Sequence, residues 1–261
     1  MAAARAIAVK SIKDTGWIKG GFFGTNISKK SFSNWANGGT NNTALVANSS
    51  LFAIYHSAND KCIWGNYLDL AFGVIRNGGA KISLTGTAND GKTKPFVKNE
   101  DKLVFTTKYG RKITATLNYA ALFNLKTQIF PGWTADDILR QNNHISNFLT
   151  QGNGELSVGI DFKPTSYFSI YFSPFTAKYK VVREQRLADL GSFGVKAAEY
   201  SDTTGGKPLI RIKVDETLRK EFVWHANIFF KKDIAKNINL QSRLDLFNNY
   251  QNIGQNIDIN C

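Results

Sequence analysis

The chain of 261 residues is long enough for one large β domain or two small domains. Hydrophobic residues make up 43% and charged residues 20%, as in ordinary globular proteins, while aromatic residues reach 13% and favour β structure. The formal net charge is +13, but the basic residues are spread along the whole chain, so a nucleic-acid partner is not expected.

Several other classes of protein are excluded by missing motifs. No run of 18 or more apolar residues exists, so no transmembrane helix is expected, and residues 1–16 lack a signal-peptide core and are expected to be unstructured. The sequence holds no G-x-S-x-G, H-E-x-x-H or P-loop pattern, so no cofactor and no metal are expected. Cys62 and Cys261 belong to no C-x-x-C motif, and whether they pair stays open.

The dominant pattern is alternation of apolar and polar residues, which predicts β-strands along the whole chain. A first strand at 18–27 and a second at 43–56 are expected, with the Gly- and Asn-rich "SFSNWANGGTNN" as the loop between them. Trp35 in this loop is either an ordinary loop or girdle residue or a ligand-stacking residue at the mouth of a barrel. Further strands are expected at 62–74, 102–109, 112–128, 155–162, 167–181, 221–230 and 238–247, and a tenth is an option at 208–214.

Helical signals are scarce and lie between the strands. Residues 134–149 could form a short helix with Thr134 as its cap, and residues 183–194 could form a single turn. Both segments are therefore expected to belong to loops.

Connections of two lengths alternate along the chain. Short turns are expected at 57–60, 110–112, 163–166 and 232–237. Long connections are expected at roughly 28–42, 77–100, 131–153 and 182–218. Outer-membrane barrels have short periplasmic turns and long external loops, so this alternation predicts a single-domain, antiparallel, up-and-down transmembrane β-barrel.

The two faces of each strand differ, which predicts opposite environments for them. Leu68, Leu117, Ile160 and Leu244 are expected to face lipid. Asp69, Asn118, Asp161, Arg243 and Asp245 are expected to point inward. The candidate inner binding residues are Asp69, Lys126, Asp161, Glu221, His225, Arg243 and Asp245. These charges either pair into a plug or line a pore that selects small solutes by charge.

The chain has three histidines, His56, His144 and His225, which lie in different predicted strands or loops. His144 has Asp136 and Asp137 nearby in sequence and is the one candidate for a barrel enzyme that acts on lipid or peptide. The expected function is non-enzymatic: passage or binding of small solutes, or envelope structure. A soluble, basic, ligand-binding β-barrel is the third alternative, and its apolar faces would point inward.

Several blocks of the sequence carry a resemblance that spans nearly the whole chain. They are WIKGG, SFSNWANGG, NYLDLAFG, ISNFL, FKPTSYFSIYFSPFTAKY, LADLGSFGV and LQSRLDLFNNYQNIGQNIDIN. These blocks resemble a Bacteroidota family of unknown function whose members look like secreted outer-membrane β-barrels. The resemblance implies an outer-membrane location and lipid as a partner, and it carries over no catalytic residue.

The predicted number of strands bears on whether the barrel can close. Nine or ten strands are expected in this chain, whereas the resemblance implies about 12 in full family members. Single-chain bacterial barrels close on even numbers of strands. The chain is therefore expected to lack C-terminal strands and to form an open or poorly closed barrel.

Overall fold

The fold is one large antiparallel β-sheet in a computed structural model that describes residues 15–32, 40–78, 95–134, 144–200, 211–213, 217–235, 238–250 and 257–260. Its ten strands follow one another in the sheet in chain order. They are β1 (Gly16–Lys30), β2 (Asn42–His56), β3 (Cys62–Asn77), β4 (Val97–Lys112), β5 (Leu117–Thr127), β6 (Gly152–Thr165), β7 (Phe168–Val181), β10 (Leu218–Ala235), β11 (Ile238–Asn249) and β12 (Ile257–Asn260). The predicted all-β, up-and-down architecture is confirmed.

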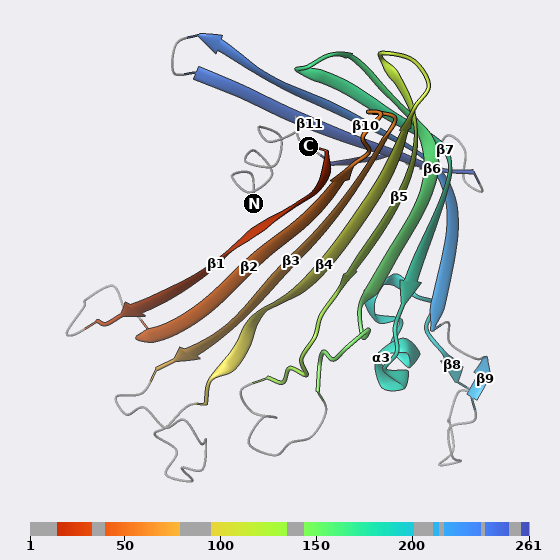
Figure 1. The fold of residues 1–261 in the computed structure, drawn as a ribbon. Coiled ribbons are helices and arrows are strands. Elements are labelled where there is room, and N and C mark those ends of the chain that lie inside the picture. The colour runs from red at the N-terminus through yellow and green to blue at the C-terminus, as the bar shows by residue number, and fades with distance from the viewer. Residues whose placement is uncertain are drawn as a thin grey trace.

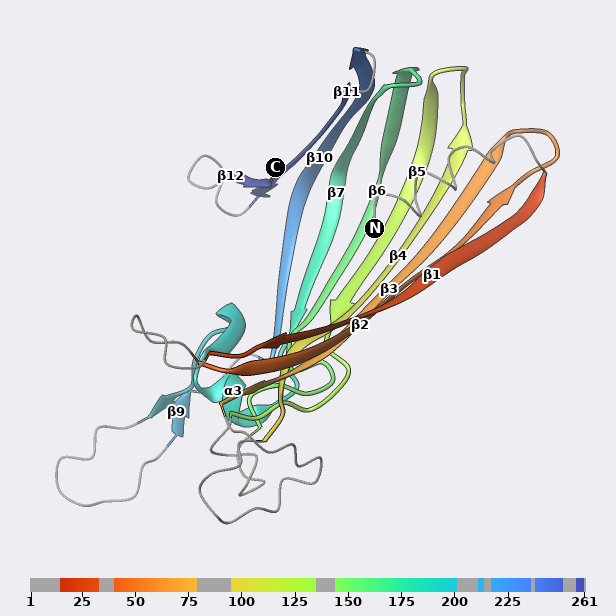
Figure 2. The same cartoon turned by 90° about the vertical axis from the view of Figure 1, so that its left-hand side faces the viewer.

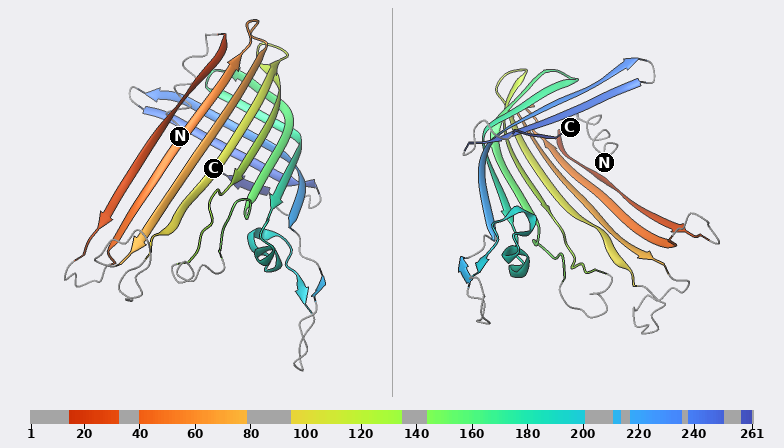
Figure 3. Two further views of the ribbon diagram at one scale, coloured as in Figure 1. Left: turned by 60° about the horizontal axis from the view of Figure 1, so that its bottom comes forward. Right: turned by 180° about the vertical axis from the view of Figure 1, so that it is seen from behind.

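The sheet is strongly curved and twisted. Figure 2 shows it as a curved wall, and in Figure 3 the strands β10 and β11 run across the direction of β1–β4. In the described part of the chain, β1 pairs with β2 and β12 pairs with β11, so these two strands form the edges of the sheet. No helix among the described residues is long and apolar enough to cross a membrane.

Short turns and long connections lie at opposite ends of the strands (Figure 1). The end with the short turns joins β2 to β3, β4 to β5, β6 to β7 and β10 to β11. The other end carries the described parts of the long connections. These include the helix α3 (Gln185–Asp189), the 3-10 turn η1 (Ser192–Gly194) and a separate two-stranded sheet of β8 (Glu199–Tyr200) and β9 (Arg211–Lys213).

Two strand assignments differ from the sequence-based prediction. The segment 208–214 does not supply the tenth strand of the large sheet, because β9 pairs with β8 in the small sheet. The tenth strand is β12, which lies in the C-terminal segment and pairs with β11. Alternation in 208–214 predicted a strand correctly but could not identify its partner.

The turn between β4 and β5 also differs. It lies at 113–116 and not at 110–112, because β4 continues to Lys112. The Thr114 hydroxyl accepts hydrogen bonds from the backbone N–H groups of Thr116 (3.4 Å) and Leu117 (3.1 Å). Such side-chain bonds to nearby backbone close a turn locally. Because Ile113 and Ala115 continue the alternation of apolar and polar residues, the position of the turn could not be recognised in the sequence.

The two helical predictions have different outcomes. The predicted turn within 183–194 is confirmed by α3 and η1. Of the segment 134–149, residues 135–143 lie outside the described residues. The described residues 144–149 are not helical, and Ser146 forms an isolated β-bridge with Gly132.

The two faces of the sheet have an unusual distribution of polar and apolar side chains. We call the face that carries Asp161 and His225 the inner face and the opposite one the outer face. On the inner face, these two side chains are 4% and 5% exposed. On the outer face, Phe23, Ile27 and Phe175 are 72%, 75% and 76% exposed. Polar groups are thus buried while large apolar groups are exposed, the reverse of a water-soluble fold.

A small cluster of buried apolar side chains lies outside the large sheet. Val182, Leu187, Ala188 and Val195 pack together with Phe193 in the connection between β7 and β10. The largest fully buried side chains are Val182, Thr150, Thr176, Ser157 and Ser173, four of which are hydroxyl residues. Within the large sheet, the buried apolar side chains of the described residues are Ile54, Ala71, Ala120, Tyr171 and Val223, so burial of apolar side chains contributes little to the stability of the sheet in water.

A β-bulge interrupts β7 in the middle of the strand. Val158 of β6 pairs with Phe175, while Ile160 pairs with Phe172, so β7 holds one residue more than β6 in this interval. Pro174 lies in the bulge, where the absence of its N–H is tolerated. Gly159 of β6 lies opposite, and a methyl group there would overlap with the Phe172 carbonyl oxygen. The bulge therefore requires glycine at this position.

Candidate functional site on the inner face of the sheet

The candidate site residues fall into separate groups on the inner face. Cross-strand register decides which of them meet, because side chains of one face become neighbours only when their strands align. Asp161 of β6, Asn227 of β10 and Asp245 of β11 lie in one cross-strand row that passes through Tyr171 of β7. The other candidates lie nearer to one or the other end of the strands.

His225 is the centre of the first group. Its Nδ1 atom lies 3.1 Å from Glu155 Oε1, and its Nε2 atom lies 3.2 Å from Asp245 Oδ1. The imidazole ring stacks on Phe247 with 4.2 Å between ring centroids. Two carboxylates and a ring therefore hold this histidine in one orientation.

Asp245 connects His225 to two further polar side chains. Asn227 Nδ2 donates a hydrogen bond to Asp245 Oδ1, and Arg243 Nε donates to Oδ2 at 2.9 Å. Of the predicted residues, the structure brings together His225, Arg243 and Asp245. This group resembles the salt-bridged interior that the sequence offered as one of two alternatives.

Asp161 is the centre of the second group, near the short turns. Lys108 Nζ and Lys163 Nζ each lie 2.9 Å from its Oδ2 atom. These three residues line a cavity of about 370 Å³ together with His56 and Asn118. The carboxylate is neutralised by two ammonium groups, so the cavity retains positive charge.

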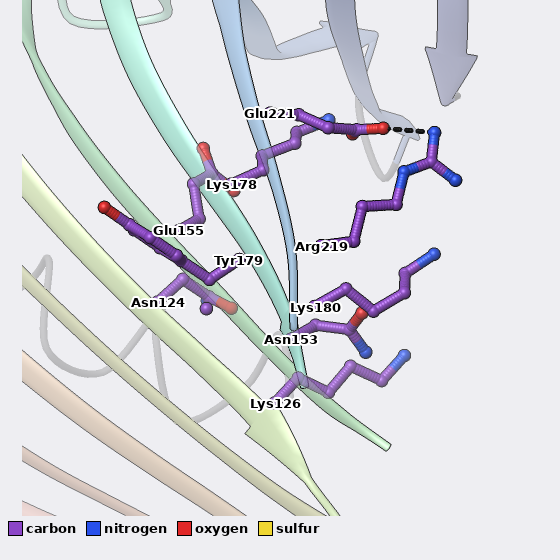
Figure 4. Close-up of a pocket in the computed structure, with 10 residues that line it drawn as sticks. Asn124, Lys126, Asn153, Glu155, Lys178, Tyr179, Lys180, Arg219 and Glu221 are labelled. Atoms are coloured by element: carbon purple, nitrogen blue, oxygen red, sulfur yellow. Dashed lines mark ion pairs between the residues drawn. The ribbon is translucent and has the colours of Figure 1, made fainter. Parts of the chain in front are cut away.

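Lys126 and Glu221 belong to a third group, in a cavity of about 360 Å³ near the long connections (Figure 4). Glu221 Oε1 lies 2.5 Å from Arg219 Nη2. In sequence, Glu221 shares the polar face of β10 with His225, but the histidine contacts Glu155 and Asp245 instead. The third group is therefore separate from the first.

Asp69 stands apart from these groups. It is 7% exposed, and its Oδ1 atom accepts a hydrogen bond from Ser50 Oγ at 2.5 Å. Trp35 and the pair Asp136 and Asp137 lie outside the described residues. His144 contacts Glu184, with 2.8 Å between Nε2 and Oε2, and its carbonyl oxygen accepts a hydrogen bond from Arg186.

Sequence reasoning did not single out five important members of these groups. They are Lys108, Glu155, Lys178, Lys180 and Arg219. Lys108 and Glu155 could have been found, because each alternates with apolar residues in a predicted strand. Lys178 and Lys180 could not, because the bulge in β7 breaks the alternation between them and the first half of the strand.

An aromatic row crosses the outer face near the short turns. Trp17, Tyr55, Trp64 and Tyr109 are aligned across β1–β4 by register. The Trp17 ring centroid lies 5.4 Å from that of Tyr55 and 5.6 Å from that of Trp64. Trp64 Nε1 donates a hydrogen bond to Thr107 at 2.8 Å. Rows of this kind are typical of a membrane–water interface, where a ring needs one apolar and one polar side.

Comparison with known proteins gives one partial result. Residues 27–133 match a family model described as "Protein of unknown function (DUF3078)". The match covers less than half of the chain: the end of β1 and all of β2–β5. It includes Asp69 and Lys126 but not the group around His225. No curated protein and no solved structure matches the chain.

The described side chains of the inner face offer charged groups and hydrogen-bond donors. Within the described ranges, no three His, Cys, Asp or Glu side chains are grouped as a metal site would require. The inner face offers ammonium, guanidinium and amide donors beside two cavities. Such groups suit the binding of a polar solute.

Proposed function

We propose that the chain is an outer-membrane β-barrel protein without enzymatic activity, and that its inner face binds or passes small polar solutes. The observation that carries this proposal is the reversal of the faces, with hydroxyl and charged groups buried and large apolar groups exposed. A soluble monomer rarely exposes apolar patches beyond a few hundred Å². A lipid environment would remove this cost for the outer face, while water would solvate the inner face.

Three further features support the same proposal. The nine long strands have 11 to 18 residues each, and about 9–11 tilted residues cross a bilayer. Short turns and long connections occupy opposite ends of these strands, as in outer-membrane barrels. The aromatic row on β1–β4 lies where the short-turn end of an apolar band would meet the membrane interface.

The finer points of the proposal rest on sequence resemblance. The blocks SFSNWANGG and LDLFNNYQNIGQNID resemble Bacteroidota outer-membrane proteins, and a family description of unknown function is consistent with that origin. A purely structural role in the envelope, without passage of solutes, is the simpler form of the same proposal. The enzyme alternative relied on His144 beside two aspartates, whereas its described partner is Glu184.

Extraction and heat modification test the proposal directly. The full chain should remain with membranes in plain buffer and dissolve only in detergent. After refolding in detergent, it should migrate on a sodium dodecyl sulfate gel at one position unheated and at another after boiling. A chain that dissolves in plain buffer as a folded monomer would refute the membrane assignment.

A further inference from the structure

We propose that the inner face holds an anion site near the long connections, formed by Lys126, Asn153, Lys180 and Arg219, that binds small oxyanions of the phosphate type. The inference deepens the proposed function and rests on it in one respect, because it assumes water on the inner face. It assigns a ligand class to one cavity and predicts nothing about the other.

The geometry of the site follows from strand register. Lys126 of β5 pairs with Asn153 of β6, Asn153 pairs with Lys180 of β7, and Lys180 pairs with Arg219 of β10. Neighbouring strands lie about 4.8 Å apart, so the four residues form a row about 14 Å long. Figure 4 shows their side chains projecting in a common direction from these strands.

The two carboxylates near this row do not pair with its lysines. Glu221 pairs with Arg219 at 2.5 Å, and Glu155 Oε1 lies 3.1 Å from His225 Nδ1. Among the side chains that the structure describes, no carboxylate lies within ion-pair distance of Lys126 or Lys180. Their two ammonium groups therefore remain available to a solute.

The cavity as a whole has an excess of positive charge, although its next cross-strand row places Lys178 between Glu155 and Glu221. The Nζ atom of Lys178 lies 3.4 Å from the centroid of the Phe247 ring. The cavity lining contains four basic and two acidic side chains. Because a cavity with low-dielectric walls focuses the field of its charges, this excess attracts anions and repels cations.

The chemical types of the hydrogen-bond donors in the row determine which anions it prefers. Lysine ammonium groups are compact, strongly hydrated charges that bind phosphate oxygens, and the Asn153 amide between two of them adds a directional donor. Arg219 is fixed by an ion pair with Glu221 and by a hydrogen bond that it donates to the Gly194 carbonyl oxygen at 2.8 Å. It therefore forms one rigid end of the row. A cavity of about 360 Å³ accommodates a phosphate ester of small size.

A titration with inorganic phosphate tests the inference. The full chain, refolded in detergent, is titrated by calorimetry at constant ionic strength, with sodium chloride as the reference titration. The test variant is K126Q/K180Q. The control is K29Q/K30Q, which removes the same charge at the end of β1 from two residues that line neither cavity.

The expected result is specific to the row. Each lysine removed from it should weaken phosphate binding about tenfold, the equivalent of 1.4 kcal/mol. The control should change the affinity by less than about twofold, because distant charges are screened at physiological salt. Both double variants should keep the heat-modifiable mobility of the wild type, which shows that they fold.

Three outcomes would overturn the inference. They are equal loss of affinity in both double variants, absence of wild-type phosphate binding, and binding only to phosphate presented on anionic lipid vesicles. In none of these cases does the membrane assignment fail, because that is decided by detergent dependence of the wild type. Conversely, a chain soluble in plain buffer would refute the proposed function, and the same titration would still decide the anion site.

Discussion

A lysine at Val158 would test which environment surrounds the outer face. Val158 lies in the middle of β6 and is 60% exposed, so its replacement removes little protein packing. In water, such a surface substitution changes the free energy of unfolding by about 0.5 kcal/mol or less. At the midplane of a bilayer, a lysine on the lipid face costs roughly 2–4 kcal/mol. The two environments therefore predict clearly different values.

V104K is the matched control for V158K. Val104 lies in the middle of β4 on the inner face and pairs in register with Asp69 on β3. A lysine there would meet a carboxylate and water, so we expect a change of less than about 1 kcal/mol. Leu117 is less suited to this comparison, because it is the first residue of β5 and lies next to the turn.

The assay is reversible guanidinium unfolding of the full chain in lipid vesicles, followed by tryptophan fluorescence. We expect V158K to lower the free energy of unfolding by 2–4 kcal/mol and V104K to leave it nearly unchanged. If V158K proves harmless, or if both variants lose the same amount, the assignment of the outer face to lipid is wrong.

Three further predictions address other parts of the fold. G159A should lower the free energy of unfolding by about 1–3 kcal/mol in the same assay, because the added methyl group overlaps with backbone at the bulge. G154A should be nearly neutral, because its methyl group would come no closer than 3.7 Å to a neighbour, and equal losses would contradict the bulge argument. Protease added to intact cells should cut the long connections only, and cleavage confined to the short turns would reverse the orientation. In the turn after β2, the hydrogen bond from Lys112 holds the pKa of Asp60 below its usual value. The small stability that this pair adds is therefore present at neutral pH and disappears as the pH falls through that lowered pKa. An NMR titration of the Asp60 carboxyl should show the low pKa in the wild type and a normal one in K112Q.

The strands could be predicted from sequence because alternation is a local property. Each residue's face follows from its neighbours two positions away. The lengths of the connections are also visible in the sequence, which is why the ends of the sheet could be assigned. The turn after Lys112 was misplaced because alternation continues through Ile113 and Ala115, and only the Thr114 hydroxyl bonds reveal where the chain reverses.

The groups on the inner face could not be predicted in the same way. Glu155, His225 and Asp245 meet because β6, β7, β10 and β11 align in a particular register, and this alignment includes a bulge. A period of two indicates which face a side chain occupies but not its height relative to other strands. For the same reason, the shared face of Glu221 and His225 on β10 did not reveal that Glu221 pairs with Arg219, its neighbour on the same strand, while His225 meets Glu155 and Asp245 on other strands.

The bulge in β7 changes which residues of the strand point inward. Before it, odd-numbered residues such as Tyr171 point inward; after it, even-numbered residues such as Lys180 do. Deletion of Pro174 would remove the extra residue and leave both halves of β7 on their present faces, because Ser173 (inward) and Phe175 (outward) would then alternate directly. Deletion of a residue in the regular part of the strand, such as Ala177, would instead turn the residues beyond it to the opposite face, so that Lys180 would lie on the outer face. The strand should therefore tolerate the loss of one residue at the bulge better than the loss of one residue elsewhere.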